Sequence, residues 1–79
     1  MRLSLRIWLN GEAQEVPDGI SLSELVAHLG LAAERIAVEV NLRVVRRSDW
    51  GTTRIEAEDR LEVVHFVGGG FSKSGVKSD

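Results

Sequence analysis

Three consecutive glycines, Gly68, Gly69 and Gly70, follow the apolar run VVHFV near the C-terminal end of the sequence. Because glycine has no Cβ, its backbone approaches other atoms closely and adopts conformations that are closed to other residues. Such an arm would let an enzyme reach a terminal carboxylate in a narrow site with no side chain in the way. Two other interpretations are a flexible linker and a phosphate-binding loop. The phosphate loop fits poorly, because such loops lead into a helix and no helical pattern follows.

Few other residues offer chemistry. The sequence has no cysteine and only two histidines, His28 and His65. The lack of cysteine excludes disulfides, thiolate-held zinc and cysteine-bound iron–sulfur clusters. His28 falls in the last turn of a predicted helix, where a solvated side chain near the negative end of the helix dipole is the simplest interpretation. We therefore predict no catalytic residues, no metal site and no bound cofactor, and hence a protein that is not an enzyme.

Size and charge narrow the class of protein further. At 79 residues the chain forms one domain at most, and its net charge of −2 disfavours a nucleic-acid binder, whose interface is usually basic. No apolar run approaches the ~20 residues that span a bilayer. The first residues alternate and then turn polar, unlike a signal peptide. We expect a cytoplasmic protein that binds neither nucleic acid nor membrane.

The elements that position the glycines begin with a hairpin. Apolar residues alternate with Ser4, Arg6 and Trp8 over residues 3–9, which predicts a half-buried strand. Asn10-Gly11 then suits a type I′ turn, because both central residues need positive φ. A second strand is expected to run back to residue 17.

A helix is predicted next. Ser21 and Glu24 have the spacing of a capping box, and Ile20 and Leu25 occupy the positions of a hydrophobic staple. Apolar residues recur at i, i+3, i+4 and i+7, so that one face of the helix is apolar. Gly30 is placed to end the helix in a left-handed conformation.

The remaining pattern predicts strands over 36–40 and 61–67, with a short strand at 43–45 that pairs back. One helix over a mixed sheet of four or five strands is an α+β layout, with the first and last strands as central neighbours. Trp50 is expected in a tight turn, with its indole packed on the domain. We predict a folded domain over 1–67 and a flexible glycine arm and tail over 68–79, in which residues 71–79 form a disordered tail.

A docking surface is expected beside the arm. Leu61 and Val63 should face the core, so that Val64 and Phe66 point to the outer face of the last strand. Trp8 lies outward on the neighbouring strand. Together these three side chains would form an exposed apolar patch, which usually marks an interaction site. For Trp8 alone, the alternative is packing over the sheet with no partner.

Several motifs carry a family resemblance: NGE in the first turn, VxxN at 38–41, RSDW at 47–50 and EDRLEVVHFVGGG at 58–70. In these motifs the chain resembles the ThiS family, the ubiquitin-like β-grasp sulfur carriers of thiazole formation in thiamine biosynthesis. The likeness covers residues 3–70. Arg46 departs from it, because many relatives have proline before the arginine, and the residues after Gly70 depart from it too.

The resemblance implies a specific chemistry. A ThiF-like enzyme would use ATP and Mg²⁺ to adenylate the carboxylate of Gly70. Sulfur from cysteine, delivered through a desulfurase, would displace AMP and leave a thiocarboxylate. A ThiG-like thiazole synthase would then take the sulfur. By the same resemblance, Gly68 and Gly69 form the arm that presents Gly70.

The tail bears on this chemistry, because the Gly70 carbonyl is amide-bonded to Phe71 in this sequence. The resemblance therefore implies a precursor, and we predict that a protease removes residues 71–79. The alternatives are a sulfur carrier of another pathway, such as the molybdopterin-synthase small subunit, a protein-modifying ubiquitin-like tag, and a β-grasp interaction module with an inert linker.

Overall fold

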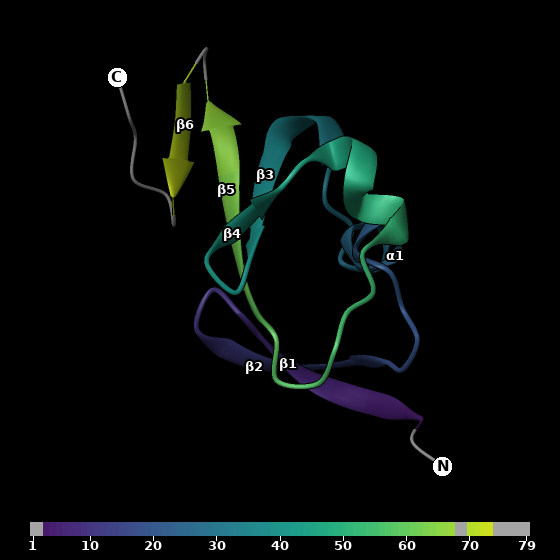
Figure 1. Ribbon diagram of the computed structural model, residues 1–79. Coiled ribbons are helices and arrows are strands. Elements are labelled where there is room, and N and C mark those ends of the chain that lie inside the picture. The colour runs from purple at the N-terminus through teal and green to yellow at the C-terminus, as the bar shows by residue number, and fades with distance from the viewer. Residues whose placement is uncertain (1–2, 68–69, 74–79) are drawn as a thin grey trace.

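The computed structural model describes residues 3–67 and 70–73. Its chain begins with a hairpin of β1 (Ser4–Leu9) and β2 (Glu12–Pro17) (Figure 1). The two strands pair antiparallel from Ser4↔Pro17 to Leu9↔Glu12. Asn10 and Gly11 have φ angles of 50° and 85°, as the predicted type I′ turn requires.

The helix α1 spans Leu22–His28, and both predicted ends are confirmed. The Ser21 hydroxyl accepts from the Glu24 backbone N–H at 3.1 Å, and the Glu24 carboxylate accepts from the Ser21 N–H at 2.9 Å. Gly30 has φ 73°, and its N–H and that of Leu31 donate to the Ala27 and Val26 carbonyls. This pair of hydrogen bonds is a Schellman motif, which satisfies carbonyls at the end of the helix.

Two short 3₁₀ segments flank the next pair of strands. After Ala33–Arg35 come β3 (Ile36–Val40) and β4 (Arg43–Val45), and then the second segment, Arg47–Thr52. Trp50 lies in this second segment, 3% exposed, and its indole N–H donates to the Val45 carbonyl at 2.9 Å. The predicted turn with an inward indole is confirmed.

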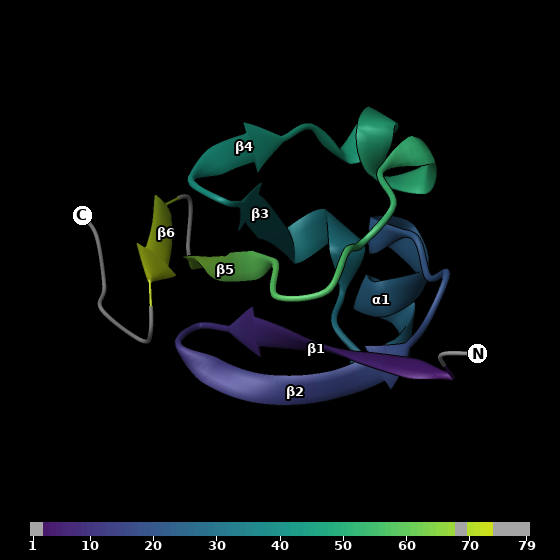
Figure 2. The ribbon, with the colours of Figure 1, turned by 60° about the horizontal axis from the view of Figure 1, so that its bottom comes forward.

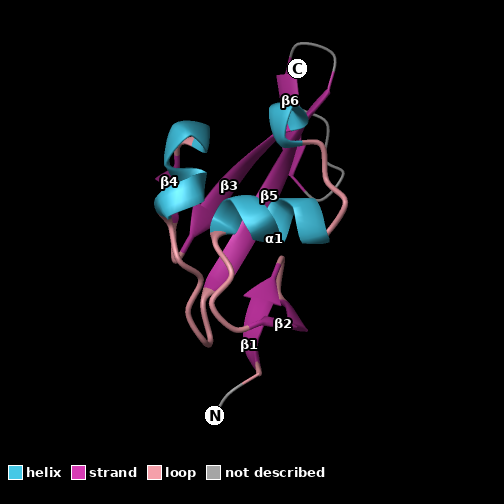
Figure 3. Ribbon diagram, turned by 90° about the vertical axis from the view of Figure 1, so that its right-hand side faces the viewer, coloured by secondary structure: helices cyan, strands magenta, loops and turns pink. Residues whose placement is uncertain are grey.

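The strands form one mixed sheet in the order β2-β1-β5-β3-β4, with β5 (Arg60–Val67) at its centre. β5 runs parallel to β1 and antiparallel to β3. Figure 3 shows α1 crossing one face of this sheet. The predicted α+β class, with one helix on a mixed sheet and the first and last main strands as neighbours, is confirmed as a ubiquitin-like β-grasp fold.

In the described part of the chain, a hydrophobic core that is aliphatic except for Trp50 fills the space between α1 and the sheet. Its buried members are Leu5, Ile7, Val16, Ile20, Leu22, Leu25, Val26, Ile36, Val38, Trp50, Ile55, Leu61 and Val63. They come from β1, β2, α1, β3, β5 and the segments between them, so burying them fixes the position of β5 relative to the helix.

A sixth strand, β6 (Gly70–Lys73), differs from the sequence prediction. It pairs antiparallel with β5, with Cα partners Val64↔Lys73, His65↔Ser72, Phe66↔Phe71 and Val67↔Gly70. Figures 1 and 2 both show β6 beside the C-terminal part of β5. Residues 71–73 were expected in a disordered tail, but the edge of β5 offers their backbone a ladder of hydrogen bonds, which short-range sequence patterns do not reveal. Residues 74–79 lie outside the described part of the chain.

Candidate functional site

The strand that leads to the glycines is held on both sides. β3 pairs with β5 over Leu61–His65, whereas β1 pairs with it only at Arg60 and Leu61. Leu61 and Val63 are 2% and 4% exposed and face the core, as the sequence predicted. The strand that precedes the glycines, which ends at Val67, is therefore the central strand of the sheet.

Asn41 and Asp59 fix the start of β5. The Asn41 amide donates to Asp59 Oδ1 at 2.9 Å, and its oxygen accepts from the Arg60 N–H at 3.0 Å. Its backbone N–H donates to the Arg60 carbonyl at 2.7 Å. Asp59 Oδ2 in turn accepts from the Glu56 N–H at 2.8 Å. The asparagine of VxxN and the aspartate of EDR are thus hydrogen-bonded to each other, although they are 18 residues apart.

Asn10 joins β1 to the middle of β5. Its backbone N–H donates to the Leu61 carbonyl at 2.8 Å, and its side-chain oxygen accepts from the Val63 N–H at 2.8 Å. Sequence reasoning assigned Asn10 only to a turn and missed this contact. The contact could have been expected from the position of Asn10, directly after a strand that was expected beside β5. An asparagine side chain there can accept a hydrogen bond from a backbone N–H of the neighbouring strand.

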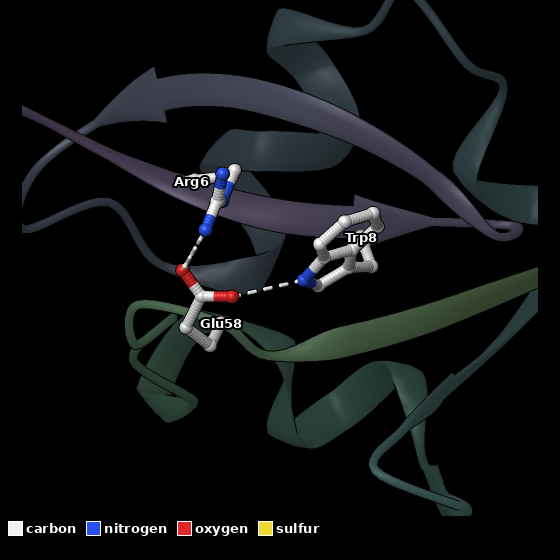
Figure 4. Close-up of polar contacts among 3 residues, drawn as sticks. All are labelled: Arg6, Trp8 and Glu58. Carbon is white, nitrogen blue, oxygen red and sulfur yellow. Dashed lines mark hydrogen bonds and ion pairs between the residues drawn. The ribbon is translucent and has the colours of Figure 1, made fainter.

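Trp8 belongs to a polar cluster on the outer face of the sheet (Figure 4). Its indole N–H donates to Glu58 Oε1 at 3.0 Å, and Arg6 forms an ion pair with Glu58 Oε2 at 3.1 Å. The guanidinium groups of Arg6 and Arg60 lie 5.5 and 5.7 Å from the indole ring centroid, within cation–π range. The hydrogen bond from Trp8, then that from Arg6, lower the pKa of Glu58 below its ordinary value.

The structure does not bring the three predicted docking residues together. Trp8 is the partner of Arg60 at the start of β5, and Phe66 lies six residues further along that strand. At a rise of ~3.3 Å per residue this separation is roughly 20 Å. The half-buried indole instead packs in the Arg6, Glu58 and Arg60 cluster, so the expectation of one continuous patch is wrong.

Val64 and Phe66 differ in their exposure. Phe66 is 44% exposed, which agrees with an outward side chain beside the arm. Val64 is only 9% exposed and is not a member of the core cluster. It lies between β3 and β6, partnered by Ala37 and Lys73, so neighbouring strands enclose it on both sides. The expected exposure of Val64 is therefore wrong, and its docking role stays a prediction.

Gly70 is the first residue of β6 and the Cα partner of Val67. Gly68 and Gly69, the other two predicted arm residues, lie outside the described residues. Within residues 3–67 and 70–73, no helix is long and apolar enough to cross a membrane, and no group of acidic, histidine or cysteine side chains is arranged to hold a metal ion.

The sequence is similar to a known family and to known proteins. The sequence model of the ThiS family matches residues 7–70. A thiazole synthase of Magnetococcus marinus is 44% identical over 66 residues, which make up 84% of this chain and 20% of that protein. A second thiazole synthase, of Paramagnetospirillum magneticum, is 32% identical, and the match spans 22% of its length. The chain thus spans about a fifth of the thiazole synthases it matches.

The structural comparison covers a protein of similar length. The crystal structure of the thiamine biosynthesis protein ThiS from Geobacter metallireducens superposes with a TM-score of 0.75 at 30% sequence identity. The match covers 84% of this chain and 100% of that one. With a family model that matches most of the sequence and a relative of the same fold, the chain belongs to the ThiS family.

Proposed function

We propose that this chain is a sulfur carrier of thiamine biosynthesis, with Gly70 as the residue that bears the sulfur. Membership of the ThiS family supports the carrier role. The observation that supports Gly70 is where the family match ends: it stops at residue 70, the last of three glycines that follow the central strand. A glycine arm on a firmly held strand suits a group that must reach into the active sites of other proteins.

The proposed chemistry begins with a free Gly70 carboxylate. An adenylating enzyme of the ThiF type, which would bind ATP and Mg²⁺, attaches AMP to this carboxylate and releases pyrophosphate. A desulfurase takes sulfur from cysteine as a persulfide, a thiol reduces that persulfide to hydrosulfide and ends in a disulfide, and the hydrosulfide then attacks the acyl carbon. The C–S bond forms, the bond to the AMP oxygen breaks, and a thiocarboxylate remains. This chain supplies the acyl group and holds it on the glycine arm, and the partner enzymes catalyse the steps.

The proposed acceptor is a thiazole synthase. Two relatives of this chain carry that name, and each is about five times longer than the segment it shares with this chain. Their names favour a ThiG-like partner over the acceptor of a different sulfur pathway.

The proposal requires cleavage between Gly70 and Phe71. An amide carbonyl offers ATP no carboxylate oxygen, so the Gly70–Phe71 bond must be hydrolysed before adenylation. The protease that removes residues 71–79 is a further proposed partner.

Intact mass measurement of the protein from its native cells tests the proposal. A species that ends at Gly70, or one heavier than it by one exchange of sulfur for oxygen, is the expected result. Purely full-length protein in cells that are making thiazole would contradict it. Loss of the gene should also cause a requirement for thiazole, and growth without added thiazole would point to another acceptor pathway.

A further inference from the structure

The edge of β5 that faces β1 is filled by three different groups in succession. β1 supplies backbone partners for Arg60 and Leu61, and the Asn10 side chain accepts from the Val63 N–H. Beyond this point β1 has ended, and β6 pairs with residues 64–67. Because Val64 and His65 are already partnered by β3 on the other edge, β6 must lie on the β1 side.

The direction of the backbone groups identifies which residues this edge presents. The Leu61 carbonyl and the Val63 N–H both point to the β1 side, where Asn10 binds them. Backbone groups alternate between the two edges of a strand, so those of His65 and Val67 point the same way. Their Cα partners there are Ser72 and Gly70.

Removal of residues 71–79 would leave this part of the edge open. An open edge is a row of unpaired N–H and C=O groups, which is a ready template for another extended chain. The edge also ends close to Gly70, because Val67, the last residue of β5, lies only three residues before it. A protein that grips this edge would hold the arm at its base and direct Gly70 into its own active site.

We propose that residues 64–67 of β5 form a strand-binding site, which β6 occupies in the uncut chain. After cleavage, an extended segment of the adenylating partner occupies the same edge by strand addition. The tail then has two effects: it blocks the Gly70 carboxylate chemically, and it competes for the site at which the partner docks. This inference rests on the proposed carrier function.

Hydrogen exchange tests the occupation by β6. Ser72→Pro removes the backbone N–H that faces His65 and should release β6 from β5. Lys77→Pro is the control, because it places the same ring four residues after the end of β6. In the chain of 79 residues, the His65 and Val67 amides should be protected. They should exchange about tenfold faster or more in Ser72→Pro and in the chain cut after Gly70, but not in Lys77→Pro. Equal exchange in the two proline variants would overturn the occupation by β6.

Binding to the adenylating enzyme tests the partner. The chain cut after Gly70 should bind at least about tenfold more tightly than the full chain. Ser72→Pro in the full chain should recover most of that difference, whereas Lys77→Pro should not. If Ser72→Pro binds as weakly as the full chain, the bulk of the tail and not its strand pairing is responsible, and the inference fails.

A variant of the edge itself separates this inference from the carrier function. In the cut chain, Val67→Pro removes an edge N–H beyond the β3 ladder, which ends at His65, and Val67→Ala keeps it. Val67→Pro should weaken binding about tenfold relative to Val67→Ala. Equal binding, with Gly70 still converted to the thiocarboxylate, overturns the strand site and leaves the carrier function standing. If Gly70 of the unaltered cut chain is not converted to the thiocarboxylate, the carrier function is contradicted instead. The hydrogen-exchange experiment still tests whether β6 occupies the edge of β5.

Discussion

Val67 and Gly70 are Cα partners across the antiparallel β5–β6 ladder, so the chain from Gly70 onward runs back along β5. The residue proposed to carry sulfur is therefore folded back against its own sheet in the uncut protein. For any enzyme to bind Gly70 on an extended arm, this pairing must open. Cleavage after Gly70 removes Phe71, Ser72 and Lys73, which are the residues of β6 that would close it again.

Phe66 is expected to contribute its side chain to partner binding. It is 44% exposed and lies two positions before the first of the three glycines. Phe66→Ala in the cut chain should raise the Kd for the adenylating enzyme about fivefold or more, because aromatic anchors dominate many interfaces. The midpoint of urea unfolding should change little. Val44→Ala is the control, since Val44 is 68% exposed on β4, and an equal effect of both variants would remove Phe66 as a specific contact.

Asn10 is expected to stabilise the fold through Val63. In Asn10→Gly the left-handed backbone remains accessible, but the Val63 N–H loses the acceptor that it has at 2.8 Å. We expect a loss of about 1–2 kcal/mol in the free energy of unfolding, measured by urea denaturation. Asn10→Asp keeps an oxygen at the same place and should retain most of the stability. If the glycine and aspartate variants are equally stable, the side-chain acceptor contributes nothing.

Leu42 has a left-handed backbone conformation that is unfavourable for leucine. It has φ 71° in the β3–β4 turn and is 90% exposed, so the left-handed conformation is not offset by burial. With Asn41 at φ 52°, the turn has the conformation that Asn-Gly prefers. Leu42→Gly should therefore stabilise the protein by about 1 kcal/mol, measured as the free energy of unfolding.

The matched control for that position is Leu42→Ala. Alanine removes the exposed side chain but keeps the Cβ that is strained at positive φ. It should show no comparable gain. A glycine variant no more stable than the alanine variant would mean that backbone strain at residue 42 is not a cost to this fold.

The lowered pKa of Glu58 predicts that the stability of the protein depends on pH. Its pKa is lowered in the folded state, chiefly by the Trp8 hydrogen bond and then by Arg6, from an ordinary value of 4.5. A lowered folded pKa stabilises the protein above the unfolded pKa, and the gain is lost as the pH falls through the folded value. Glu58→Gln should therefore be less stable than the parent above pH 4.5, and the difference should disappear in stronger acid.

Trp8→Phe tests the cause of that shift. Phenylalanine keeps an aromatic ring beside Arg6 and Arg60 but removes the indole N–H that donates to Glu58. In a carboxyl NMR titration, the pKa of Glu58 should move upward in this variant, toward its ordinary value. An unchanged pKa would assign the shift to the arginines instead.

Short-range patterns were enough to predict most of the elements. The capping box at Ser21, the left-handed end at Gly30 and the Asn10-Gly11 turn are set by contacts within four residues or by glycine's own backbone freedom. Alternation placed Leu61 and Val63 on the core face, because a strand with one buried face must alternate. Motif resemblance indicated the family, and the family supports Gly70 as the chemical end of the arm.

Tertiary structure alone decided how distant segments meet. No local pattern shows that Trp8 bonds Glu58 across 50 residues, that Asn10 accepts from Val63, or that Val64 is enclosed between two strands. The pairing of β6 with β5 is of the same kind. Residues 71–73 have no core pattern of their own. They form a strand because β1 ends early and leaves the edge of β5 open, which is a property of the sheet and not of their sequence.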